Sequence, residues 1–123
     1  MRSSFDILNA LYNILDIPGL PKIIIGSGSL TEAGEFITIG TINNPNTYLQ
    51  NGYGNLNIYV PQRSEGREDT FRLKQLTDLI IPIIEDVDSG NYHFQIDDDK
   101  GMFSDPERDG KTYYNIKFQY QTL

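Results

Sequence analysis

The sequence predicts an α+β fold of two layers, a mostly antiparallel sheet with two helices on one face. Residues 55–60, 92–97 and 114–120 alternate apolar and polar side chains, as strands with one buried face do. Residues 4–16 and 70–86 instead carry apolar side chains at helical spacing. Together with two further strand-like segments, these patterns give the expected order α-β-β-β-α-β-β.

The length predicts a single domain, residues 1–123. The chain has 123 residues, of which 38% are hydrophobic. A chain of this size buries one modest core and leaves little room for a deep substrate cavity.

The first helix is expected over residues 4–16. Ser3 and Asp6 resemble a capping box, with Asp in place of Glu. The sequence Pro18-Gly19 ends the helix. Its expected buried face consists of Phe5, Leu8, Leu11, Tyr12 and Leu15.

Three strands are expected to follow. Residues 22–25 form a short β-branched run, and residues 34–42 form a longer strand in which Ile37 and Ile39 share one face. Residues 43–54 are rich in Asn, Gly and Pro and predict a long polar loop.

The third of these strands, residues 55–60, is the clearest. Leu56, Ile58 and Val60 point to one face, and Pro61 closes the strand.

The second helix is expected over residues 70–86, with Asp69 as its N-cap. Pro82 lies inside this range and predicts a kink or an early end, because proline removes a backbone donor. The expected buried stripe consists of Leu73, Leu76, Leu79, Ile80, Ile83 and Val87.

The last two strands are expected to form a hairpin joined by a long acidic loop, residues 98–111. The periods of all these elements predict a core that includes Leu76, Ile80, Ile58, Phe94 and Phe118.

No metal, cofactor or catalytic site is expected. The chain has no cysteine and one histidine, His93, so it lacks the ligands of a conventional zinc site. Residues 97–101 resemble part of a calcium loop, but Ile96 and Lys100 then fall where oxygen ligands are needed. Aligning Asp105, Glu107 and Asp109 instead leaves Ile116 in place of the bidentate glutamate.

Residues 26–29, Gly-Ser-Gly-Ser, follow a strand as a phosphate loop would. They lack a third glycine and a Walker lysine, and Glu32 and Glu35 lie nearby. We therefore interpret this segment as a strand connection.

The charge argues against nucleic-acid and membrane binding. The net charge is −7 and no lysine or arginine cluster supplies a phosphate-binding patch. The longest apolar run, residues 79–84, is too short to span a membrane, and no signal peptide is expected at the start. A soluble intracellular protein is expected, with a surface past which DNA slides without binding.

The polar face of the sheet is the candidate interaction surface. It is rich in Asn, Gln and Tyr and carries little charge, as the centres of protein interfaces do. A solvated face is the alternative for an antiparallel sheet. The expected interface residues are Asn57, Tyr59, His93, Gln95, Asn115 and Lys117.

The strand 55–61, a short charged loop and the helix start 69–76 together resemble the tail-terminator, or tail-completion, proteins in the neck of long-tailed bacteriophages and prophages. The strand 34–39 and the closing hairpin fit the same layout. The resemblance implies a structural virion protein and not an enzyme. Such proteins form a ring, commonly a hexamer, that caps the tail tube and joins it to the head.

The expected partners are therefore other copies of the chain, the tail-tube protein and a head-completion or connector protein. DNA would pass through the ring without specific binding. The sheet edges, the polar face and the loops 43–54 and 98–111 would make the contacts. The alternatives are a head–tail connector of the neck and a monomeric module that binds a ligand or metal.

Overall fold

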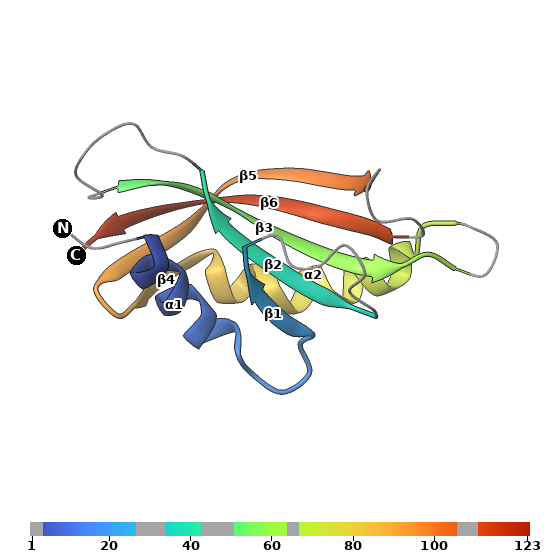
Figure 1. The fold of residues 1–123 in the computed structure, drawn as a ribbon, viewed down its shortest axis with the longest axis horizontal. Helices are drawn as coiled ribbons and strands as arrows, with labels where there is room; N and C mark the ends of the chain where they lie inside the picture. The colour runs from blue at the N-terminus through green and yellow to red at the C-terminus, as the bar shows by residue number, and fades with distance from the viewer. Residues whose placement is uncertain (1–3, 27–33, 43–50, 64–66, 106–110) are drawn as a thin grey trace.

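The α+β prediction is confirmed, with one strand more than expected. The computed structural model describes residues 4–26, 34–42, 51–63, 67–105 and 111–123. Its single sheet has the order β1-β2-β3-β6-β5-β4, in which only β1 and β2 are parallel. Both helices lie on one face of this twisted sheet (Figure 1). The elements are α1 (Ser4–Leu15), β1 (Lys22–Ile25), β2 (Phe36–Thr41), β3 (Asn51–Pro61), α2 (Thr70–Ile84), β4 (Asp86–Ser89), β5 (Tyr92–Ser104) and β6 (Lys111–Thr122).

Helix α1 buries one stripe, which includes Ile7, Leu11 and Leu15. The prediction that Phe5 belongs to it is wrong, because Phe5 is 65% exposed. Phe5 precedes Ile7 by two residues, which turns its side chain about 200° around the helix. The Asp6 carboxylate accepts a hydrogen bond of 2.7 Å from the Tyr92 hydroxyl, which ties the start of α1 to β5. Ser3 lies outside the described residues.

Helix α2 begins as predicted. The Asp69 carboxylate accepts a hydrogen bond from the backbone N–H of Arg72 at 3.2 Å. The helix ends at Ile84, two residues after Pro82 and before the predicted end. Its buried residues are Leu73, Leu76, Thr77, Ile80 and Ile84.

Two residues of the predicted α2 stripe lie elsewhere. Leu79 is 50% exposed, because the stripe steps from Leu76 to Ile80 and leaves Leu79 beside it. Val87 packs against the core, but from β4 and not from the helix.

Strand β3 is longer than predicted. Residues 51–54, predicted as loop, pair with β6 in continuous register. Gly52 and Gly54 lie beneath Tyr120 and Phe118, so the missing side chains leave room for two aromatic rings. The rest of the predicted loop, residues 43–50, lies outside the described residues.

The prediction of a long loop over residues 98–111 is also wrong for residues 98–104 and for Lys111, and residues 106–110 lie outside the described residues. Residues 98–104 continue β5, and β6 begins at Lys111. Register shifts between Ile96 and Asp98 and between Asp99 and Gly101 break the alternation in this strand.

The predicted core is confirmed. Leu76, Ile80, Ile58, Phe94 and Phe118 are all fully buried, at 0% exposure. They lie between the helices and the sheet, and the rings of Phe94 and Phe118 meet edge to face at 6.0 Å.

Candidate interaction surface

The six predicted interface residues share the sheet face opposite the helices, here called the outer face. In the strand register, Asn57 lies opposite Asn115, and Gln95 lies opposite Gln119. Each alternates with a buried neighbour, such as Ile58 beside Asn57. The structure therefore brings together residues from β3, β5 and β6 that are far apart in the sequence.

Uncharged amides hold one another across this face. The Asn115 amide nitrogen donates a hydrogen bond of 2.6 Å to the side-chain oxygen of Asn57. It donates a longer one, of 3.4 Å, to the side-chain oxygen of Asn55. The Gln95 amide nitrogen donates to the Gln119 oxygen at 2.9 Å. These bonds fix the rotamers before any partner arrives, which lowers the entropy cost of binding.

Lys117 is the one cation among the six. Its ammonium lies 3.5 Å from a carboxylate oxygen of Asp97 and 4.5 Å from the centre of the Tyr53 ring. Both contacts offset its charge, so the centre of the outer face presents little net charge to a partner.

His93 is half-buried and lies between two carboxylates of β4. Its Nδ1 is 2.6 Å from Asp88 and its Nε2 is 2.9 Å from Asp86. His93 therefore joins β4 to β5, a role that the sequence pattern did not indicate.

Tyr59 differs from the prediction, because it offers almost no surface. It lies on the outer face but is 6% exposed, with its ring stacked on Phe36 at 4.6 Å. The Tyr113 ring lies next to it at 5.2 Å, and Phe103 stacks on Tyr113 at 5.5 Å. This aromatic row crosses β2, β3, β6 and β5.

The row ends at Phe103, which is 44% exposed on β5. Sequence reasoning missed Phe103 because its segment was interpreted as a loop. It missed Tyr113 because the last strand was expected to begin one residue later. An extended alternation back to Lys111 would have found Tyr113.

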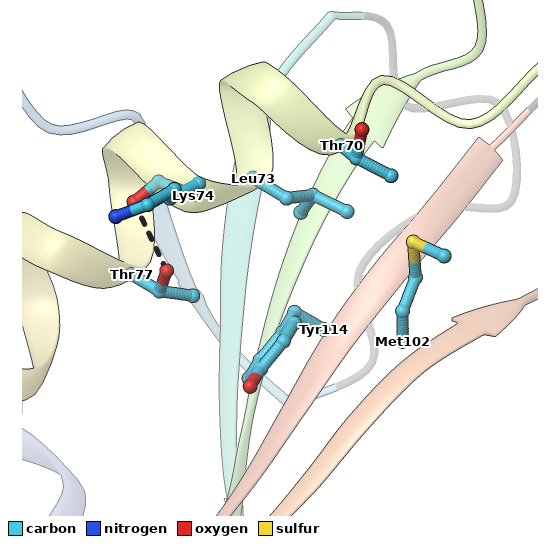
Figure 2. A pocket seen from close by; sticks show the side chains of 6 residues that line it. All are labelled: Thr70, Leu73, Lys74, Thr77, Met102 and Tyr114. Atoms are coloured by element: carbon cyan, nitrogen blue, oxygen red, sulfur yellow. Dashed lines mark hydrogen bonds between the residues drawn. The ribbon is translucent and has the colours of Figure 1, made fainter.

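A pocket of about 250 Å³ opens on the helix side, between α2, β5 and β6 (Figure 2). Desolvation, and then the hydrogen bond with Asp99, raises the pKa of Tyr114 to about 12. Lys74 forms an ion pair with Asp78 at 2.7 Å. Because its pKa is raised, the Tyr114 phenol is held in its neutral form and is not poised as a base. The lining residues are Thr70, Leu73, Lys74, Thr77, Met102 and Tyr114.

The acidic segment of β5 is engaged within the chain. Lys100 pairs with Asp98 at 2.9 Å, and Asp99 is bonded to Tyr114. Within the described residues, no group of three or more His, Asp or Glu side chains is arranged to hold a metal ion. Glu107 and Asp109 of the calcium alignment, and residues 27–29 of the glycine–serine segment, lie outside the described part.

In the part of the chain that the structure describes, no helix is both long and apolar enough to cross a membrane.

The comparisons bear on the fold alone. No protein-family model and no curated protein matches the sequence. A solved structure whose name states no function is similar to this chain with a TM-score of 0.55 and 13% sequence identity, over 100% of this chain and 97% of the other. This likeness over the full length shows that the fold occurs in another protein.

Proposed function

We propose that this chain is a tail terminator of a long-tailed phage or prophage. Its copies form a ring that caps the tail tube and joins it to the head. The observation that carries the proposal is the pair of open sheet edges. Strand β1 pairs only with β2, and β4 covers only Tyr92–Gln95 of β5 among the described residues. Open edges are hazards in a free monomer, and a closed ring covers them.

The outer face supports the same proposal. Its fixed, uncharged amides suit contact with another protein, such as the tail-tube protein or the connector of the head. The net charge of −7 keeps DNA from adhering as it passes through the ring. The site of action would be the neck of the virion.

Mass measurement tests the assembly. Native mass spectrometry and light scattering should find a closed oligomer, with a hexamer expected from the resemblance. Deleting the gene from the phage or prophage that carries it should leave separate heads and tails, and the parent gene should restore joining. A chain that stays monomeric at all concentrations and is absent from particles would overturn the proposal.

The head–tail connector is the neighbouring alternative within this class. Electron microscopy of unjoined particles separates the two roles. A terminator ring lies on isolated tails, whereas a connector ring lies on isolated heads.

The pocket beside α2 is the feature behind a second candidate, a monomeric ligand-binding module, but its size counts against that candidate. Its volume of about 250 Å³ falls below the range usual for ligand sites, which begins at roughly 300 Å³. A monomer whose melting temperature rises with a bound small molecule or with calcium would favour this candidate over the ring.

A further inference from the structure

We propose that β1 of one subunit adds as an antiparallel strand to the open edge of β5 in a neighbouring copy. In this pairing, Ile24 lies beside Phe103 and Lys22 lies beside Asp105. The inference rests on the proposed ring and identifies the interface that would close it.

The open edge of β5 has two unlike halves. The first half, residues 96–100, contains three aspartates, one lysine and the register shifts, all of which discourage strand addition. The second half, Gly101–Ser104, is uncharged. Met102 is 41% exposed and Phe103 is 44% exposed, on opposite faces of the sheet. An added strand would cover both side chains at once.

The direction of the added strand follows from the topology. Strand β1 is parallel to β2, and the steps from β2 to β3, to β6 and to β5 are each antiparallel. Strand β5 therefore runs opposite to β1. In a ring that continues the sheet from subunit to subunit, rotation about an axis along the strands keeps their direction. The neighbour's β1 consequently meets β5 in the antiparallel sense.

The faces then select the register. Phe103 lies opposite Tyr113 on the outer face, and Met102 lies opposite Tyr114 on the helix side. Ile23 and Ile25 lie on the helix side of β1, because they pair with Ile37 and Ile39. Matching faces over all four residues of β1, while avoiding the shifted half of β5, leaves one arrangement. It pairs Ile25 with Met102, Ile24 with Phe103, Ile23 with Ser104 and Lys22 with Asp105.

Asp105 belongs to this edge although β5 ends before it. Its backbone N–H donates to the Lys111 carbonyl at 3.2 Å, which continues the β5–β6 ladder by one residue. Asp105 lies on the outer face because it is opposite Lys111. Lys22 lies on the same face because it pairs with Phe36. Opposite charges thus meet at the end of the added strand.

Apolar side chains would also meet on both faces of the added strand. On the outer face, Ile24 would extend the aromatic row beyond Phe103. On the helix side, Ile25 would lie beside Met102, which lines the pocket. For a chain with a net charge of −7, an apolar strand that carries one lysine is a suitable surface to meet another copy.

Cross-linking tests the register directly, because the parent chain contains no cysteine. The double variant Ile24→Cys/Phe103→Cys should form disulfides between subunits under mild oxidation. It should give a ladder of multimers on a non-reducing gel. The matched control Ile25→Cys/Phe103→Cys places the two thiols on opposite faces and should remain mostly monomeric on the gel.

Charge reversal tests the same contact without thiols. Lys22→Glu should weaken assembly about tenfold, and adding Asp105→Lys should restore it. The control pair Lys22→Glu/Asp16→Lys has the same net charge, but its second change lies at the exposed end of α1 and should not rescue. Circular dichroism confirms that each variant is folded.

The outcomes separate the two proposals. If the parent forms a closed oligomer but shows neither the cross-link nor the rescue, this interface is wrong and the ring stands. If the parent forms no oligomer, both proposals fail. If a cysteine variant fails to fold, the charge-reversal pair decides.

Discussion

Tyr59 and Gln95 lie on the same face of the sheet, yet only Gln95 is available to a partner. Tyr59 is covered by stacking on Phe36 and by its contact with Tyr113, whereas Gln95 is exposed and bonds Gln119. The sheet face on which a side chain lies therefore does not by itself determine whether that side chain is exposed. The neighbours on adjacent strands decide it.

Tyr59→Asp should destabilise the fold by about 3 kcal/mol or more, because it buries an unpaired carboxylate. Gln95→Lys, on the same face, should change the free energy of unfolding by less than about 0.5 kcal/mol. Urea denaturation of both variants measures the difference. Equal stabilities would show that Tyr59 is not enclosed.

Ile80→Ala should cost about 2–5 kcal/mol, since the side chain is fully buried and leaves a cavity. Leu79→Ala is the matched control on the adjacent, half-exposed position and should cost under about 1 kcal/mol. Thermal and urea unfolding check both values. The reverse order would mean that the stripe of α2 is assigned to the wrong side.

The core residues could be predicted because strand alternation and helical spacing each select one face. The misses at Phe5 and Leu79 lie beside a buried stripe, where local spacing fits two assignments. Packing against the sheet then decides between them, and that information is not local in the sequence.

At the scale of elements, the second half of β5 was interpreted as a loop because its sequence carries the signals of a turn. The run Asp97-Asp98-Asp99-Lys100-Gly101 has the composition of a turn, and the two register shifts interrupt the period of two. Gly101 adopts a φ of +89°, a conformation that glycine accommodates without strain. Pairing with β6 holds the strand together despite these signals.

Gly54→Ala should destabilise the chain by about 1–3 kcal/mol or more. A Cβ at this position would overlap the Phe118 ring and come within 2.6 Å of the Gly40 carbonyl oxygen. Gly40→Ala is the control on the neighbouring strand, where a Cβ meets nothing within 4 Å. Differential scanning calorimetry should show a much lower melting temperature for Gly54→Ala alone.

Tyr114 should make stability fall at high pH. Its pKa is raised to about 12 in the folded chain, chiefly by desolvation, against an ordinary value of 10.0. The contribution of the neutral phenol is fully present below pH 10 and is lost as the pH rises through about 12. Tyr114→Phe should remove this slope from the unfolding free energy between these pH values.

Asp99→Asn provides the companion measurement, because it removes the charge that faces the phenol. The pKa of Tyr114 should then fall toward its ordinary value, as followed by tyrosinate absorbance against the Tyr114→Phe background. No change in that pKa would show that Asp99 does not act on Tyr114.

For the whole molecule, the sequence predicted the polar face and named the sheet edges as contacts, but it did not identify which part of an edge strand is open. The six predicted interface residues could be placed together because strand alternation identifies a face. The open second half of β5 depends on the order of strands and on where β4 begins, at Asp86, which pairs with Gln95. Neither follows from a local pattern, so the exposed Met102 and Phe103 went unnoticed.

The outer face and the edges make different predictions for function. Gln95→Lys places a charge among paired amides while leaving the β1 and β5 edges intact. If this face contacts the tail tube or the head, the variant should still form the parent oligomer but give about tenfold fewer joined particles. Counting infectious particles after complementation of a deletion measures the joining.

Asn13→Lys adds the same charge on the exposed side of α1 and should join heads to tails like the parent. If Gln95→Lys also joins normally, water covers the outer face in the virion. The contacts with the tail and head would then have to lie at the strand edges, on the helices or in the connecting segments, because these are the remaining surfaces of the subunit.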